Sequence, residues 1–189
     1  MTRVTEALDY FKTDWYTEWV LKVGKRKANA TSKKALKHGT RIHEIISGTS
    51  PIDSKDSIEV KNCYKGFLAW KERYNVQTLK LLERNTDDGI GLTGEPDALW
   101  VEKDTLIDWK SSSRISPNNF LQLGGYRRLG FKCSHLGIVR LDKELGTFEY
   151  VTNDDIGLSI EMCVDAFESA FKHYLYYKQI NEKLGGENG

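Results

Sequence analysis

The sequence is poor in several features that mark particular protein classes. It has only three cysteines in 189 residues, and Cys63, Cys133 and Cys163 lie far apart. An odd and widely spaced set argues against a disulfide framework, and no close pair is present to begin a zinc site. We therefore expect three buried thiols.

Long hydrophobic runs are also missing. The apolar stretches are far too short to cross a bilayer. The first residues also lack the apolar segment that a signal peptide has. The sequence thus predicts a protein of the cytoplasm, or of the host-cell cytoplasm if a phage encodes it, with no membrane partner. It also has no Gly-x-Ser-x-Gly elbow and no Walker lysine loop.

A dinucleotide-binding fingerprint is matched only on paper, by GIGLTG at residues 89–94. That fingerprint must follow a strand and open a helix. Here Pro96 and the strand-like residues 98–101 follow it instead. We expect no bound nucleotide.

Residues 20–43 lack acidic side chains altogether, although the net charge of the chain is only +1. Such a basic segment is either a solvated face or a nucleic-acid surface, and its position beside His43 favours the second interpretation. Its Lys and Arg residues are Lys22, Lys25, Arg26, Lys27, Lys33, Lys34, Lys37 and Arg41.

What is present fits one α/β domain over residues 1–189, with 39% hydrophobic and 29% charged residues. A mainly helical part, residues 1–76, precedes a core at 77–180 that ends in a helix. The order of elements predicts a central mixed β-sheet flanked by helices.

Expected early helices cover residues 5–11, Asp14–Val23, 32–47 and 56–74, the last burying Phe67, Leu68 and Trp70. Expected strands cover residues 78–84, 90–101, 105–111, His135–Leu141 and 147–152, with a helix from Ser116 and a last helix capped at 153–155 and ending near 180.

Two acids and a lysine lie on the two central strands of this pattern. Side chains alternate along a strand, so Asp108 and Lys110 point to the same side, and Asp97 lies on the preceding strand. A carboxylate buried between Leu106-Ile107 and Trp109 needs a cation, either Lys110 or a metal ion. This combination is typical of sites that bind a hard cation and cleave phosphodiesters.

Two helices add further candidates. His43 lies one turn after Gly39 and is either a core histidine or, beside the acids, a metal ligand; we favour the ligand. Gln122 and Tyr126 share one helix face. Gly124 and Gly125 between them cost about 2 kcal/mol relative to alanine, which indicates a close approach to the sheet or to DNA.

Taken in order, Gly39-x-x-x-His43, Pro96-Asp97, Asp108-Trp109-Lys110 and Gln122-x-x-x-Tyr126 resemble the motifs of the PD-(D/E)xK nuclease superfamily, in its RecB-type branch. The resemblance spans residues 4–141. Within the branch, the chain looks most like the mitochondrial genome-maintenance exonucleases and small phage exonucleases.

The resemblance implies a restriction-endonuclease-like core and one or two Mg²⁺ or Mn²⁺ ions. Asp97, Asp108 and the Trp109 carbonyl would bind one ion, and His43 with Asp97 a second. Lys110 would act on the attacking water or on the phosphate, and Gln122 would position the site. No iron–sulfur cluster is expected, because the CRISPR-adaptation nucleases of this superfamily use four cysteines to hold one and this chain has three. The implied DNA contacts are Lys33, Lys34, Lys37, Arg41, Ser111, Ser112 and Tyr126.

The expected activity is metal-dependent exonucleolytic hydrolysis of DNA, preferably linear and single-stranded or with frayed ends, in replication, recombination or repair. A structure-selective endonuclease and a non-catalytic DNA- or protein-binding module are the alternatives. Glu83 is a possible outer metal ligand, whereas Glu95 is expected to face away from Asp108.

Overall fold

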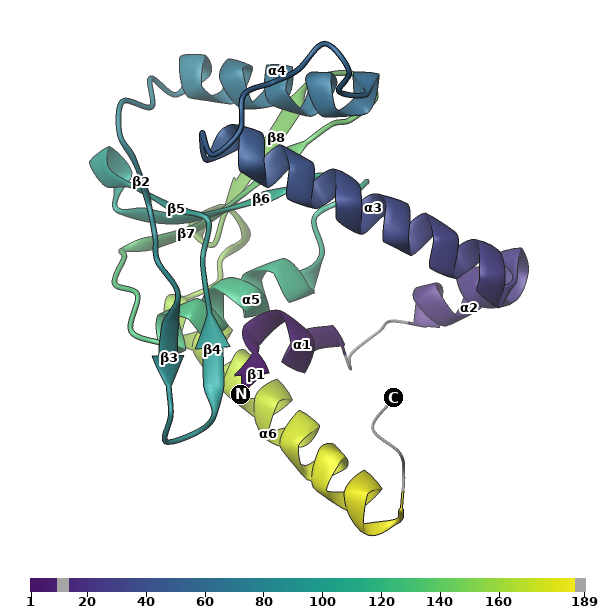
Figure 1. Ribbon diagram of the computed structural model, residues 1–189. Coiled ribbons are helices and arrows are strands. Elements are labelled where there is room, and N and C mark those ends of the chain that lie inside the picture. The colour runs from purple at the N-terminus through teal and green to yellow at the C-terminus, as the bar shows by residue number, and fades with distance from the viewer. Residues whose placement is uncertain (10–13, 186–189) are drawn as a thin grey trace.

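The computed structural model describes residues 1–9 and 14–185 (Figure 1). Its helices are α1 (Val4–Asp9), α2 (Asp14–Val23), α3 (Lys25–Ile46), α4 (Ile58–Arg73), α5 (Pro117–Arg128) and α6 (Ile160–Lys183). Its strands are β1 (Thr2–Arg3), β2 (Leu79–Leu81), β3 (Asn85–Asp87), β4 (Leu92–Gly94), β5 (Ala98–Trp100), β6 (Thr105–Lys110), β7 (His135–Leu141) and β8 (Phe148–Thr152).

The larger sheet has the strand order β2-β5-β6-β7-β8. Strands β6 and β7 are parallel and are joined through α5, while the other neighbouring pairs are antiparallel. A smaller sheet, β1-β4-β3, lies beside it. The expected fold class, a mixed sheet flanked by helices, is confirmed.

Alternating side chains of β6 divide the core into two clusters. Ile107 and Trp109 pack with Ile42 of α3 and Trp70 of α4. Leu106 packs on the other face with residues of α1, α5 and α6. Asp108 and Lys110 have the same parity as Leu106, so they face α5.

The break between β4 and β5 changes the predicted strand pattern. One strand was expected over residues 90–101, but pairing stops after Gly94 and resumes at Ala98. Pro96 has no N–H to donate to a ladder, which accounts for the interruption. The break lets Asp97 leave the regular alternation of the strand. The two-residue strand β1 and strand β3 were not predicted.

Helix boundaries differ from expectation at several places. The predicted helix 5–11 begins at Val4, and its residues 10 and 11 lie outside the described residues. Helix α3 begins at Lys25 rather than 32, directly after Gly24 at a φ of 83°. Leu68 is exposed because the sheet-facing side of α4 carries Phe67 and Trp70.

Helix α6 is capped by Ser159, whose hydroxyl accepts from the Met162 N–H, and not by residues 153–155. Asn153 is buried and accepts from the Leu136 N–H. The three cysteines are buried, as expected. No helix within the described residues is long and apolar enough to cross a membrane.

The two glycines of α5 explain how the helices pack. A Cβ at Gly124 would collide with the Cys163 carbonyl of α6, and one at Gly125 would lie 2.7 Å from Val4 and 2.8 Å from Phe167. The close approach is therefore to α6 and α1. The expectation that these glycines meet the sheet or DNA is wrong.

Candidate active site

Asp108, Lys110 and Gln122 form a closed ring of polar contacts between β6 and α5. Lys110 Nζ lies 2.6 Å from Asp108 Oδ2 and donates to Gln122 Oε1 at 2.9 Å. The Gln122 amide donates in turn to Asp108 Oδ1 at 2.9 Å. Asp108 is only 2% exposed, while Lys110 is 22% exposed. The sequence prediction that Asp108 and Lys110 share a side is confirmed, and the buried carboxylate has the lysine as its cation.

Tyr126 completes this arrangement from one turn further along α5. Its hydroxyl accepts a second hydrogen bond from the Gln122 amide, at 2.7 Å. Burial raises the pKa of Tyr126, so its phenol remains neutral. The side chain is 4% exposed, which leaves it little surface to pack along DNA as predicted. It is placed instead to hold Gln122.

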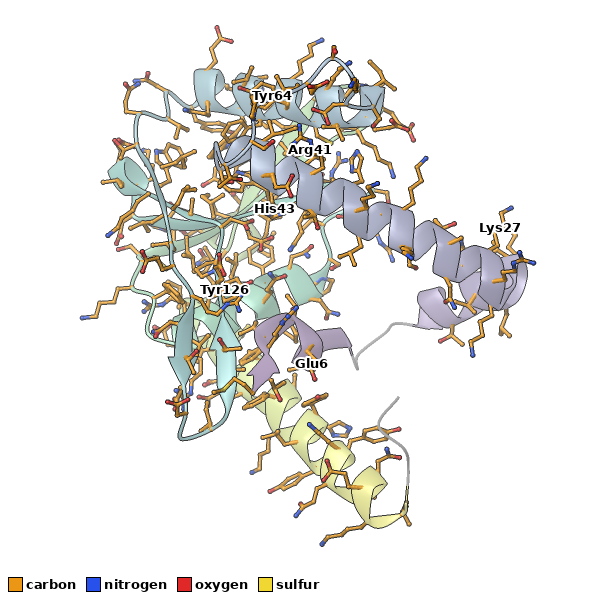
Figure 2. All side chains as sticks on the ribbon, viewed as in Figure 1. Glu6, Lys27, Arg41, His43, Tyr64 and Tyr126 are labelled. Carbon is orange, nitrogen blue, oxygen red and sulfur yellow. The ribbon has the colours of Figure 1, made fainter. Side chains whose placement is uncertain are left out.

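His43 and Asp97 form a second pair at the other end of the site. His43 Nδ1 on α3 lies 2.9 Å from Asp97 Oδ1. The other Asp97 oxygen accepts from the backbone N–H of Trp109 at 2.7 Å. The Trp109 ring packs edge-on against His43 with centroids 6.3 Å apart. Figure 2 shows His43 on α3, on the side of the helix nearest β5 and β6.

Burial and mutual charge set the protonation of these groups. Burial raises the pKa of Asp108; Lys110 opposes the rise and the nearby Asp97 carboxylate adds to it. Burial lowers the pKa of His43, but the hydrogen bond and charge of Asp97, with Asp108 behind it, outweigh this effect and raise it. A cation placed between the two acids would therefore be electrostatically favourable.

The donor set suits a hard divalent ion, because it consists of two carboxylates and an imidazole. Asp108 Oδ2 is buried and, despite the nearby lysine, has no hydrogen bond of regular geometry within the described chain. The described residues do not, however, form a ready group of three or more metal ligands. Each carboxylate oxygen has more than one lone pair, so Asp97 and Asp108 could bind an ion after a small shift while they keep their present partners.

A cleft of about 500 Å³ opens beside this site. His43, Asp97, Trp109 and Tyr126 line it, while Asp108 lies behind them. The cleft also has charged residues that the sequence did not single out as site residues, namely Arg3, Glu44, Arg84 and Glu95.

Arg84 and Glu95 form an ion pair of 3.1 Å at this cleft. Glu95 was expected to face away from the site, but the strand break at Pro96 cancels the alternation on which that expectation depended. Glu83 is exposed, and only its neighbours Leu82 and Arg84 line the cleft. The structure gives no support to Glu83 as an outer ligand.

The predicted DNA contacts divide into exposed side chains and side chains engaged in hydrogen bonds. Lys33, Lys34 and Lys37 are exposed along α3. Arg41 instead holds Asp56 through Nε at 2.7 Å and Nη2 at 2.8 Å, and also donates to Ser50 and to the Pro51 carbonyl. This bidentate network fastens the loop after α3, so Arg41 has no free fork for a phosphate.

The two serines after Lys110 also differ from each other. Ser111 borders a second pocket, of about 380 Å³, which Lys34 and His38 also line. The Ser112 hydroxyl donates to the Arg114 carbonyl at 2.8 Å within its own loop. Of the two, only Ser111 lines a pocket together with one of the α3 lysines.

The sequence matches no family model and no curated protein sequence. The fold is similar to solved structures at low sequence identity. An alkaline exonuclease from Laribacter hongkongensis, LHK-Exo, is 15% identical with a TM-score of 0.45 over 97% of this chain and 94% of that one. The structure of LHK-Exo in complex with dAMP is 16% identical with a TM-score of 0.43, over 97% of this chain and 94% of that one. A phage-related exonuclease from Haemophilus somnus 129PT is 15% identical with a TM-score of 0.33 over 74% of this chain and 81% of that one. Because these TM-scores lie below 0.5, we base the functional argument on the site itself.

Proposed function

We propose that this chain is a Mg²⁺- or Mn²⁺-dependent deoxyribonuclease of the PD-(D/E)xK superfamily, in its RecB-type branch, and that it acts as an exonuclease. The observation that carries this proposal is the ring of Asp108, Lys110 and Gln122 next to the His43–Asp97 pair. These residues belong to four separate motifs of the sequence, and the fold brings all four together at the end of β6.

Asp97, Asp108 and the Trp109 carbonyl would hold a divalent ion, with His43 available to a second. When bound, such an ion lowers the pKa of water and offsets the charge of the phosphate. Neutral imidazole is the form that binds metal, so His43 would first give up its proton, whose retention Asp97 favours.

Lys110 would serve the reaction with its ammonium group, which Asp108 and Gln122 hold in place. It would donate to the attacked phosphate or to the attacking water. Water would form the new P–O bond, the bond to the leaving sugar oxygen would break, and that oxygen would take up a proton. The products are one phosphate-bearing and one hydroxyl-bearing DNA end.

A non-catalytic binding module is the main rival, and one observation favours it. The Asp108–Lys110 ion pair is complete without any metal, so it serves equally well as a structural pair. Enzymatic turnover separates the two functions, because a structural pair predicts none.

The proposed function is tested by incubating the purified protein with end-labelled linear DNA and with closed circular DNA, in Mg²⁺ and separately in Mn²⁺. We expect nucleotides to be released from linear DNA, most readily from single-stranded or frayed ends, and excess EDTA to stop their release. If closed circular DNA is cut as fast as linear DNA, the protein is an endonuclease and the exonuclease assignment is wrong. Cleavage that persists in EDTA would refute the metal assignment, and a lack of cleavage with either metal would favour the binding module.

A further inference from the structure

The C-terminal part of α6 projects from the body of the protein (Figure 1). It also exposes large apolar side chains. The Tyr174 hydroxyl still donates to Glu6 of α1, at 2.6 Å. Beyond it, every described residue of α6 except Asn181 is exposed. The exposed apolar residues are Leu175, Tyr176, Tyr177, Ile180 and Leu184. Exposed apolar surface of this extent is typical of protein–protein interaction sites.

Apart from Leu175, which is turned towards the side of Phe171, the exposed apolar residues belong to a stripe that continues along the whole helix. Met162 and Ile180 are 18 residues apart, which is five turns of an α-helix, so they lie on the same side. They are 55% and 57% exposed. The smaller Ala166 and Ser169 lie between them on this side. The stripe from Met162 to Leu184 is about 33 Å long and differs from the side of Phe167 and Phe171, which is buried.

Charge is distributed unevenly along the same helix. Its first half, residues 160–171, has Glu161, Asp165 and Glu168 and no Lys or Arg. Its second half, residues 172–183, has three lysines and a single acid, Glu182. Asp165 and Lys183 are again five turns apart and therefore flank the stripe on one side. Both are exposed, and neither is ion-paired with another described residue.

We propose that this face of α6 binds a second copy of the chain as an antiparallel helix pair, with the two-fold axis near His173 and Tyr174. In that arrangement Asp165 of each copy lies opposite Lys183 of the other, so the pair forms twice. Ala166 faces Ile180 and Ser169 faces Tyr177, which sets small residues against large ones. A parallel pair would instead place acid against acid and lysine against lysine.

Charge also argues for a second copy over DNA as the occupant. Asp165 lies on the edge of the stripe and would repel phosphates, whereas in the antiparallel pair it meets a lysine. The proposal does not depend on the nuclease assignment. The cleft of the candidate active site is lined by residues of the N-terminal segment, α3, the β2–β6 region and α5, so the pairing leaves it open.

Sedimentation velocity over a concentration series tests the pairing with charge reversals. Asp165→Lys and Lys183→Asp should each weaken dimerisation by about tenfold, since each turns two attractive pairs into repulsive ones. The double variant Asp165→Lys with Lys183→Asp should restore it. Lys178→Glu is the matched control, because residue 178 lies two positions from Ile180 and hence on the opposite side of the helix.

Ile180→Asp gives a second test on the apolar stripe, where we expect a loss of about a hundredfold in dimer affinity. Ile180 is exposed in the single chain, so the variant should keep the melting temperature that the wild type shows at high dilution. A wild-type protein that stays monomeric up to its solubility limit would overturn the proposal. A dimer whose affinity does not change with the charge reversals would also overturn it. The same holds for an Ile180→Asp variant that loses DNA affinity while the wild type is monomeric.

Discussion

The ring at Asp108 and the lysines of α3 use charge in opposite ways. Asp108 is 2% exposed and has Lys110 within 2.6 Å, with Gln122 joining the two. Lys33, Lys34 and Lys37 are exposed on one long helix. A charge fixed in a low-dielectric environment interacts strongly with a developing charge, whereas exposed charges act weakly and at longer range, under control of salt. We therefore propose that the first region carries out the chemistry and that the second captures DNA.

Lys110→Ala should give the largest effect. It tests whether the ring at Asp108 carries out the chemistry. The turnover at saturating DNA should fall by two to four orders of magnitude, about what a positioned proton-transfer group contributes. DNA binding should change little, because the α3 lysines are untouched. Lys80→Ala, on the exposed strand β2, is the matched control. A near-wild-type rate in Lys110→Ala would make the Asp108–Lys110 pair a structural feature.

The effect of a metal ion on protein stability tests the proposed role of the Asp108 ring in a second way. A divalent ion that binds only the folded protein should raise the free energy of unfolding by about 2.7 kcal/mol at a hundredfold excess over its dissociation constant. Asp108→Asn should abolish this gain, because it removes a proposed ligand. The melting temperatures of both proteins, with Mg²⁺ and with EDTA, measure the effect. An equal gain in Asp108→Asn would place the ion elsewhere.

The second half of the comparison is tested by the salt dependence of binding. Each lost phosphate contact lowers the slope of log K against log salt by about 0.7 for single strands. Replacing Lys33, Lys34 and Lys37 with alanine should therefore weaken binding and reduce the slope by about 2, with an unchanged cleavage rate at saturating DNA. Fluorescence anisotropy at several salt concentrations gives the slope. An unchanged slope would remove α3 from the DNA path.

The smallest expected effect concerns Arg41, whose ion pair with Asp56 distinguishes it from the exposed lysines of α3. The hydrogen bond from Arg41 lowers the pKa of Asp56 from 3.8 to about 2. A lowered folded-state pKa contributes stability that is present above pH 3.8 and lost as the pH falls towards 2. Wild type should lose more stability over this range than Asp56→Asn, as followed by acid unfolding. Identical acid unfolding curves would contradict the assigned pairing.

The sequence predicted much of the β6 region because local rules decide it. The alternation of Leu106-Ile107-Asp108-Trp109-Lys110 determines which side chains share a face, and tertiary packing does not alter that parity. The spacing of Gln122 and Tyr126 likewise predicted their contact. The metal, the DNA contacts and the division at residue 76 stay predictions.

Other features depended on packing between distant segments. Gly124 and Gly125 indicated a close approach, but only the fold shows that α6 and α1 are the neighbours. Arg41 belonged to a run of cations, and its partner Asp56 lies fifteen residues away across a loop. Pro96 was a readable signal for the strand break, and it would have brought Glu95 into the site.

The most direct test is Mg²⁺-dependent release of nucleotides from end-labelled single-stranded linear DNA, measured side by side for wild type and Asp108→Asn at equal folded concentration. Asparagine keeps the shape of the side chain and removes the charge that a cation would bind. We predict release by wild type that needs the metal, and a rate lower by at least about a hundredfold in the variant. Equal rates for the two proteins, or wild-type release that continues in EDTA, would contradict the account.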